Sequence, residues 1–203
     1  MEALIIVDVQ NDFLPGGALA VPEGDAVVPV INRIAREFDL VVATQDWHPA
    51  GHESFASQHA GKSPGDVIDL HGLQQVLWPD HCVEHTPGAS FAAGLDVALI
   101  HHVVRKGTDR SVDSYSGFFD NGHQNATGLE QYLRDRGVNR VVVCGLATDY
   151  CVKFTILDAL QLGFEVTLVR DATRGVNLQE GDVDRALEQI YAAGGTILES
   201  RDL

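Results

Sequence analysis

The chain has 203 residues, 45% of them hydrophobic, which suits one α/β domain with a sizeable core. Its formal net charge of −15 argues against nucleic acid and anionic membrane as partners, because contacts to phosphate need clustered Lys and Arg. No apolar run reaches the ~18 residues that span a bilayer, and the three cysteines, odd in number, argue against a disulfide framework and for a reducing cytoplasm.

Short apolar runs alternate with helical patterns along the chain. The first run follows Glu2 and no basic segment, so it predicts a β-strand and not a signal peptide. Most of the runs are continuous in Val, Ile and Leu, as expected for strands that are covered on both faces. The predicted strands are Ala3–Val9, Leu40–Thr44, Val97–Val104, Arg140–Cys144, Glu165–Val169 and Thr196–Leu198.

Apolar residues at helical spacing lie between these strands. Thr127-Gly-Leu-Glu130 has the spacing of a capping box, and Gly137 and Gly163 stand where helix C-terminal caps are expected. The alternation predicts one domain over residues 1–203, with a parallel sheet between helical layers. Ligands of such folds bind at the carboxyl ends of the strands. The predicted helices are Asp25–Glu37, Thr127–Arg136 and Asp182–Ala193.

The segment from Asp46 to Ser90 is too long for a plain connection and holds six of the nine histidines. Asp46 and His48 end the second strand, and side chains one residue apart project to the same side of an extended segment. His81 is a third candidate ligand. One carboxylate and two imidazoles suit Zn²⁺, Fe²⁺ or Mn²⁺ and leave positions for water and substrate. His52 is a candidate for a further ligand.

Cys151 lies just past the fourth strand, at the predicted start of a helix. There the helix dipole and free N–H groups favour a thiolate and can hold an oxyanion. Cys144, inside the apolar strand, is interpreted as a core residue. Asp8 ends the first strand and Lys106 follows the third, so a doubly wound sheet would bring an acid, a base and a thiol to one edge. Each residue alone means little, and the prediction of a catalytic site depends on their convergence.

Three aromatic residues lie close in sequence to these candidates: Phe13, Trp78 and Tyr115. They would wall a flat aromatic substrate by stacking, although ordinary core packing explains any one of them at least as well. No Gly-x-Gly-x-x-Gly follows the first strand, which argues against a dinucleotide-binding enzyme.

With these residues assembled, the chain resembles the nicotinamidase/pyrazinamidase branch of the isochorismatase-like cysteine hydrolases. An ordered series of motifs that runs nearly end to end carries the resemblance. The motifs are Val7-Asp-Val-Gln-Asn-Asp-Phe13, Pro15-Gly-Gly17, Thr44-Gln-Asp-Trp-His-Pro49, His52-Glu-Ser-Phe55, Trp78-Pro-Asp-His-Cys82, Arg105-Lys-Gly107, Asp113-Ser-Tyr-Ser116 and Gly145-Leu-Ala-Thr-Asp-Tyr-Cys-Val152.

The resemblance implies a three-layer α/β/α fold with a doubly wound, six-stranded parallel sheet in the order 3-2-1-4-5-6. The implied catalytic triad is Asp8, Lys106 and Cys151. The implied ligands of one divalent metal ion, with Zn²⁺ first and Fe²⁺ or Mn²⁺ as alternatives, are Asp46, His48 and His81. A non-proline cis peptide between Leu146 and Ala147 is also implied, with an oxyanion hole made by the N–H groups of Ala147 and Cys151. The residues around the substrate ring would be Phe13, Trp78 and Tyr115.

The implied activity is hydrolysis of nicotinamide to nicotinate and ammonia through a cysteine thioester, in NAD salvage in the cytoplasm, with pyrazinamide also accepted. The partner is then a small molecule, and a homo-oligomer is compatible with the sequence. N-carbamoyl amide hydrolases and ureidoacrylate-type amidohydrolases would share the thiol, but the metal-ligand set argues against them. A true isochorismatase works without the nucleophile, so Cys151 argues against it. A non-catalytic metal or nicotinamide sensor on the same fold stays open.

Overall fold

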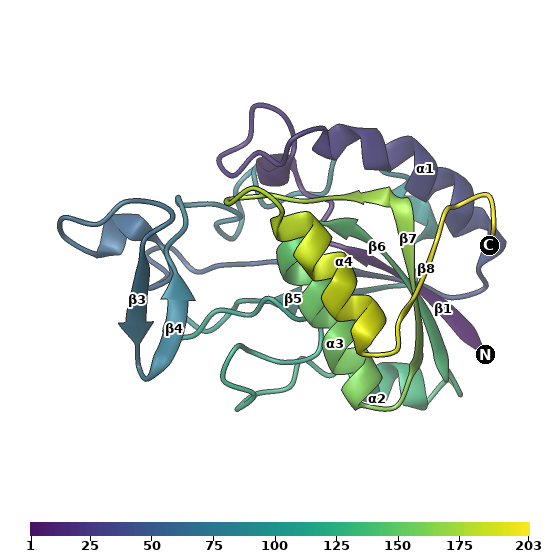
Figure 1. Cartoon of the computed structure of the whole chain (residues 1–203). Coiled ribbons are helices and arrows are strands. Elements are labelled where there is room, and N and C mark those ends of the chain that lie inside the picture. Colours follow the sequence, from purple (N-terminus) through teal and green to yellow (C-terminus); the bar gives the residue numbers. More distant parts are fainter.

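A six-stranded parallel sheet forms the centre of the computed structural model, which describes residues 1–203 (Figure 1). The strand order β5-β2-β1-β6-β7-β8 is the predicted order 3-2-1-4-5-6 of the main strands. Every pairing in this sheet is parallel. The strands are β1 (Glu2–Val7), β2 (Val41–Asp46), β5 (His102–Lys106), β6 (Arg140–Leu146), β7 (Glu165–Arg174) and β8 (Thr196–Leu198).

Helices cover both faces of this sheet, as predicted (Figure 1). Alternate residues of β1 point to opposite faces, so Leu4 and Ile6 enter one core while Ile5 and Val7 enter the other. The first core is closed by α1, and the second by α2, α3 and α4. The three layers therefore follow from continuous apolar strands. The helices are α1 (Val27–Ile34), α2 (Leu129–Arg134), α3 (Lys153–Gln161) and α4 (Asp182–Ala192).

Several predicted boundaries differ from the structure. Strand β7 ends at Arg174 instead of Val169, and α1 is shorter than the predicted helix Asp25–Glu37. The strand predicted from Val97 begins only at His102, because residues 97–99 form a 3₁₀ turn in which Val97 is 53% exposed. The capping box does not form: Thr127 Oγ1 accepts the N–H of Leu129 at 3.2 Å, and Gly128, with φ 91°, is the residue that precedes α2. The predicted caps Gly137 and Gly163 do adopt positive φ, 68° and 82°.

The segment between β2 and β5 holds a hairpin that the sequence reasoning missed. Strands β3 (Val67–Leu70) and β4 (Leu73–Val76) pair antiparallel and project from the body of the molecule (Figure 1). The two turn residues, His71 and Gly72, have φ of 53° and 88°, the left-handed conformation of the tight turns that suit hairpins. This turn was the available signal, but His-Gly is a weaker one than Asn-Gly.

The carboxyl ends of β1, β2, β5 and β6 meet at one edge of the sheet. β1 and β6 adjoin there with Val7 paired to Gly145. A Cβ atom at Gly145 would overlap the backbone of Val7, and φ is 110°, so only glycine allows this approach. The structure contains no helix long and apolar enough to cross a membrane.

Candidate active site

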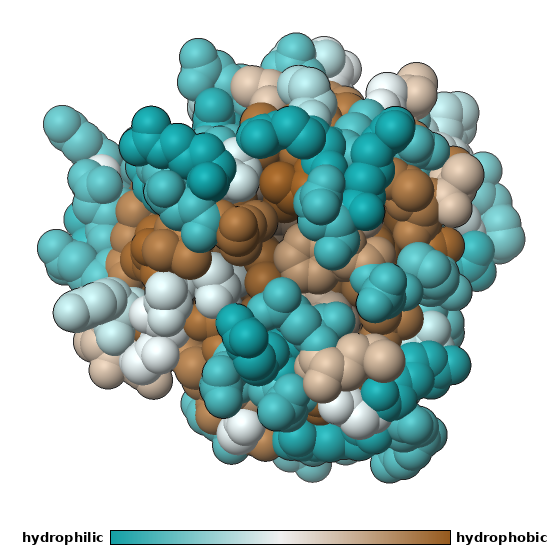
Figure 2. All heavy atoms as spheres, turned by 90° about the vertical axis from the view of Figure 1, so that its right-hand side faces the viewer, coloured by the Kyte–Doolittle hydropathy of each residue, from teal (hydrophilic) through white to brown (hydrophobic).

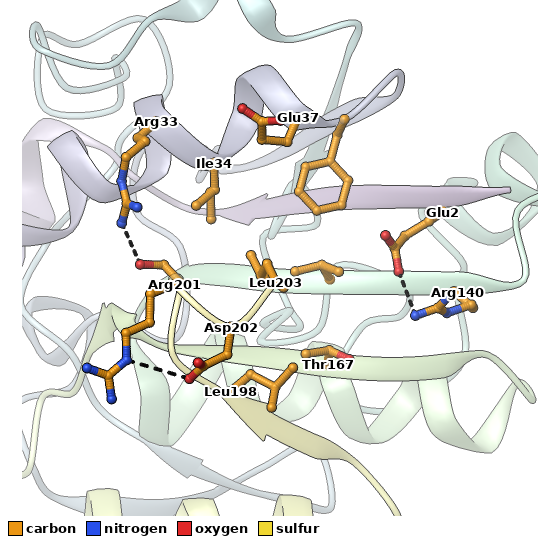
Figure 3. A pocket seen from close by; sticks show the side chains of 13 residues that line it. Glu2, Arg33, Ile34, Glu37, Arg140, Thr167, Leu198, Arg201, Asp202 and Leu203 are labelled. Atoms are coloured by element: carbon orange, nitrogen blue, oxygen red, sulfur yellow. Dashed lines mark hydrogen bonds and ion pairs between the residues drawn. The ribbon is translucent and has the colours of Figure 1, made fainter.

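The end of the molecule that carries both termini has an apolar recess between hydrophilic side chains (Figure 2). A cavity of about 580 Å³ lies between the end of α1, the first residues of β1 and β6, and the C-terminal residues (Figure 3). Several of its polar groups contact one another: Arg33 Nη2 donates to Ser200 Oγ at 2.6 Å, and Arg140 lies 3.1 Å from Glu2. None of the predicted catalytic or metal-ligating residues lines this cavity.

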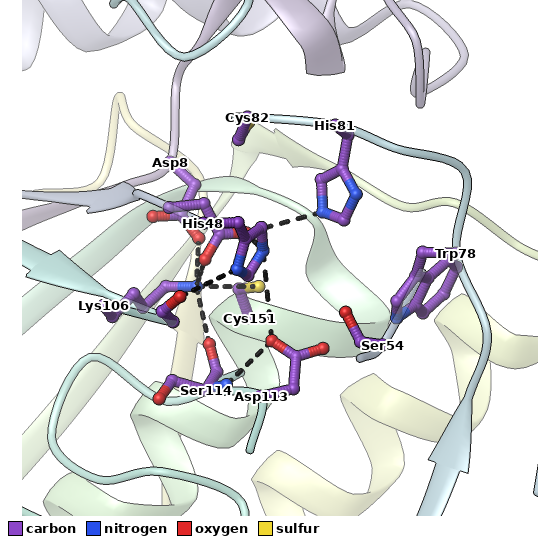
Figure 4. Close-up of polar contacts among 12 residues, drawn as sticks. Asp8, His48, Ser54, Trp78, His81, Cys82, Lys106, Asp113, Ser114 and Cys151 are labelled. Atoms are coloured by element: carbon purple, nitrogen blue, oxygen red, sulfur yellow. Dashed lines mark hydrogen bonds and ion pairs between the residues drawn. The ribbon is translucent and has the colours of Figure 1, made fainter. Parts of the chain in front are cut away.

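The predicted triad does come together, at the carboxyl ends of β1, β5 and β6 (Figure 4). Lys106 Nζ lies 2.8 Å from Asp8 Oδ2 and 3.4 Å from Cys151 Sγ. Asp8 follows β1 with φ 45°, and its Oδ1 accepts the hydroxyl of Thr44 at 2.6 Å. All three groups of the triad are buried. A thiol, a carboxylate and an ammonium group therefore share one pocket.

Lys106 also contacts one of the predicted metal ligands, Asp46, a link that the sequence reasoning missed. Its Nζ lies 2.6 Å from Asp46 Oδ1 and donates to the carbonyl of Ser114 at 2.8 Å. Burial alone would lower the pKa of Lys106, but the Asp46 and Asp8 carboxylates outweigh burial and raise it. The lysine is therefore a fixed positive charge shared by two carboxylates.

Burial dominates the acid–base properties of the other two triad members. It raises the pKa of the Asp8 carboxyl in spite of Lys106. It also raises the pKa of the Cys151 thiol well above the ordinary value, with Lys106 opposing the shift. Cys151 stands in a π-turn over Thr148–Val152 that precedes α3. Burial thus opposes the thiolate that a helix start was expected to favour.

Asp46, His48 and His81 form a donor set with the chemistry of a metal site. Figure 4 shows the two imidazoles of this set. Asp46 Oδ2 lies 3.7 Å from His48 Nε2 and 3.8 Å from His81 Nε2. In both histidines the Nδ1 atom donates a hydrogen bond to a backbone carbonyl. His48 donates to Gly107 at 2.9 Å, and His81 donates to Pro79 at 2.8 Å. This leaves both Nε2 lone pairs facing the carboxylate, and the buried His48 Nε2 has no hydrogen-bond partner. Such an arrangement fits a divalent cation.

Residues around this donor set hold it in place. The side chain of Gln10 accepts the N–H of Asp46 and donates to its carbonyl, both at 2.8 Å. Asp12 Oδ2 accepts the N–H of Cys82, next to His81, at 2.7 Å. A Cβ atom at Gly107 would overlap the ring of His48. Gln10, Asp12 and Gly107 lie in quoted motifs, but sequence alone did not assign these roles.

His52 and Asp113 lie beside the donor set and form a second group with His48. The rings of His48 and His52 are 4.4 Å apart, and Asp113 Oδ1 is 4.0 Å from His48 Nε2. His52 Nδ1 contacts Ser54 Oγ at 2.8 Å, while its buried Nε2 has no partner. His52 is therefore still a candidate for a further metal ligand. Asp113 is a second such candidate.

The pocket in front of Cys151 is lined by all three predicted aromatic residues. Trp78 Nε1 donates to the hydroxyl of Tyr115 at 3.0 Å, and the ring of Phe13 meets His81 edge-on at 5.5 Å. The peptide between Leu146 and Ala147 is cis, as the resemblance implied, and Ala147 lines the pocket beside Cys151. Lining residues that the sequence reasoning missed are Leu19, Tyr150 and Val176. The pocket therefore combines aromatic and apolar walls with the polar side chains of Asp46, His81 and Asp113.

Known proteins share this architecture over nearly the whole chain. The isochorismatase-domain family model matches residues 2–202. The nicotinamidase of Escherichia coli (strain K12) is 51% identical over 205 residues, which cover 99% of this chain and 96% of that protein. The solved structure of an Acinetobacter baumanii nicotinamidase/pyrazinamidase is similar with a TM-score of 0.96 and 44% identity, covering 99% of this chain and 97% of the other.

Two other solved structures contain a ligand. A protein of L. infantum in complex with nicotinate has a TM-score of 0.86 and 39% identity, covering 99% of this chain and 93% of the other. The pyrazinamidase of Pyrococcus horikoshii in complex with zinc has a TM-score of 0.79 and 43% identity, covering 98% of both chains. A small ring acid and a metal ion are thus ligands of proteins with this fold.

Proposed function

Since the chain belongs to the isochorismatase family, in the branch of the nicotinamidases and pyrazinamidases, we propose that it hydrolyses nicotinamide to nicotinate and ammonia through a thioester on Cys151. The observation that carries the proposal is the position of Lys106 Nζ, 2.8 Å from Asp8 and 3.4 Å from the Cys151 sulfur. Nicotinamide is a flat, uncharged ring amide, so it suits a pocket with aromatic walls and a buried nucleophile.

In the first half of the reaction, Asp8 takes the proton from Cys151 as the sulfur attacks the carboxamide carbon. Lys106 keeps its charge and stabilises the anionic pair. The oxyanion is held by the N–H groups of Ala147 and Cys151, and losing one such donor typically costs ~2.7–4 kcal/mol. Asp8 then gives its proton to the departing nitrogen. The C–N bond breaks, ammonia leaves, and a thioester remains.

In the second half, Asp8 acts as the base for water. The water oxygen forms a bond to the thioester carbon while its proton passes to Asp8. The same two N–H groups hold the second oxyanion. The C–S bond then breaks, the sulfur of Cys151 recovers a proton from Asp8, and nicotinate is released. One carboxylate therefore serves first as base and then as acid in each half of the reaction, which suits a group whose pKa burial has raised.

Asp46, His48 and His81 would hold one divalent cation, and we propose Zn²⁺ with Fe²⁺ or Mn²⁺ as alternatives. When bound, the cation would supply a Lewis acid for the ring nitrogen and so orient the substrate. The zinc complex of the Pyrococcus horikoshii pyrazinamidase supports this choice of metal. Phe13 and Trp78 would then flank the ring.

Pyrazinamide should also be accepted, because it too is a flat ring with a primary amide and a ring nitrogen. The similarity to a nicotinamidase/pyrazinamidase supports this second substrate. We assign the whole of residues 1–203 to one catalytic domain. The three free, buried cysteines favour a reducing compartment such as the cytoplasm, where the reaction would serve NAD salvage.

An ammonia-release assay with nicotinamide tests the function, run with and without a chelator beside elemental analysis of the metal. We expect release that falls as the metal is removed and returns when the metal is restored. Binding of nicotinamide with no release by the metal-loaded protein would refute the proposal and favour a sensor.

A further inference from the structure

The β3–β4 hairpin sends one buried polar side chain into the body of the molecule. Both strands are largely open to solvent, and Val67 is 55% exposed. Gln75 is the exception on β4, with only 2% of its surface exposed, while its neighbour Gln74 faces solvent. A long amide buried at the base of a projecting hairpin calls for polar partners, because an unpaired buried amide is costly.

Those partners are residues of the substrate pocket. Gln75 Nε2 lies 2.7 Å from the carbonyl of Val76, 3.2 Å from Asp113 Oδ2 and 3.0 Å from the hydroxyl of Tyr115. The carbonyl and the carboxylate only accept hydrogen bonds, so the amide nitrogen faces them and the amide orientation is determined. Tyr115 Oη also accepts the indole N–H of Trp78 at 3.0 Å. The hairpin and two aromatic rings therefore share one hydroxyl.

Asp113, Tyr115 and Trp78 all line the pocket that holds Cys151, whereas Gln75 does not. The Trp78 and Tyr115 rings stand nearly perpendicular, at 82°, and Tyr150 packs edge-on against Trp78 at 4.8 Å. One wall of the pocket is thus made of aromatic rings. The orientation of the Trp78 and Tyr115 rings depends on hydrogen bonds to the Tyr115 hydroxyl. Fixing such a wall in advance reduces the entropy lost when a ligand is bound.

We infer that Gln75 is a positioning residue for specificity: it anchors the Trp78–Tyr115 wall and Asp113, so that the hairpin determines how large a ring the pocket admits. The inference rests on the proposed function, because the ring in question is that of the amide substrate. A rigid wall binds nicotinamide tightly and excludes a ring with an added methyl group, and one methylene in a tight pocket is worth roughly 10–200-fold.

The test compares Gln75→Met, which keeps the length and removes the donors, with Gln74→Met on the exposed face of the same strand. Steady-state kinetics are measured on nicotinamide and on 5-methylnicotinamide, with metal content and thermal unfolding followed in parallel. For Gln75→Met we expect the KM for nicotinamide to rise about five- to tenfold with kcat within about twofold. The preference for nicotinamide over the methylated ring should narrow at least about threefold. Gln74→Met should match the wild type.

A KM and a preference unchanged in Gln75→Met, even with a lower melting temperature, would overturn the inference, because the residue would then be only structural. If Gln75→Met does not fold, Tyr115→Phe tests the same contact by removing the shared acceptor, and an unchanged preference there would refute it. Wild-type turnover of nicotinamide tests the proposed function separately, since the inference is judged by the ratio of variant to wild type.

Discussion

Lys106 and Asp46 form a fully buried ion pair, with Nζ 2.6 Å from Oδ1, that joins the metal-ligand set to the catalytic triad. The two residues face each other across the β2–β5 pairing. Because Lys106 also holds Asp8, one ammonium group lies against both the proposed base of the reaction and a proposed ligand of the cation. The proposed nucleophile and the proposed cation site are therefore linked electrostatically through Lys106.

Replacing Lys106 by Met should destabilise the protein strongly, because two buried carboxylates lose their counter-charge. Removing one partner of a buried ion pair typically costs about 3–5 kcal/mol. We expect a loss of that size in the free energy of unfolding, measured by urea titration, together with loss of turnover. Lys62→Met, at an exposed site, is the control and should stay within about 0.5 kcal/mol. A Lys106→Met protein as stable as the control would show that the pairing is not the source of the stability.

Replacing His48 by Ala should release the metal and weaken substrate binding, because the donor set loses one of its two imidazoles. The His71 side chain is 61% exposed, so the control variant His71→Ala should keep its metal and its affinity for the substrate. Elemental analysis and the KM for nicotinamide provide the measurements. Full metal occupancy in purified His48→Ala would remove this residue from the ligand set.

Gly107→Ala should also release the metal, although it replaces none of the metal ligands. The new Cβ atom would overlap the His48 ring and push it away from Asp46. Gly61→Ala is a matched control, because Gly61 has nearly the same φ, +74° against +64°, but open space around it. Backbone strain is then similar in both variants, and only Gly107→Ala should lose metal. Equal metal content in the two proteins would contradict the steric argument.

The pH dependence of turnover should follow Asp8. Burial raises the pKa of this carboxyl, and Asp8 must be deprotonated to take the thiol proton. Activity is then present above that pKa and lost as the pH falls through it, so the acid limb of kcat/KM should have its midpoint above the ordinary Asp value of about 4. Metal content must be followed at each pH, since protonated histidines release metal. A constant kcat/KM down to about pH 4 would contradict Asp8 as the base.

Much of the fold and of the site could be predicted from sequence because the reactive side chains lie at the ends of strands. Asp8, Asp46, Lys106 and Cys151 each follow an apolar run, and the sheet order brings those ends together. The position of Cys151 just past a strand was predicted correctly. The direction of its pKa shift was not, because burial of the thiol depends on what packs over the turn.

The features that escaped prediction depend on three-dimensional register. The Lys106–Asp46 pair requires the β2–β5 alignment, which periodicity does not determine. The hairpin escaped because its strands are short and exposed, and its turn is His71-Gly72. The role of Gln75 could not be seen without the hairpin, since its partners are about 40 residues away in sequence.

Acid quenching during turnover of nicotinamide, followed by peptide mapping, tests the central claim most directly when ammonia is measured in the same samples. For the wild type we expect a nicotinoyl group on the peptide that contains Cys151. Cys151→Ala should keep its metal but show neither the adduct nor ammonia release, whereas Cys144→Ala, the buried strand cysteine, should keep both. Ammonia release by Cys151→Ala, or an adduct on any other residue, would contradict the account.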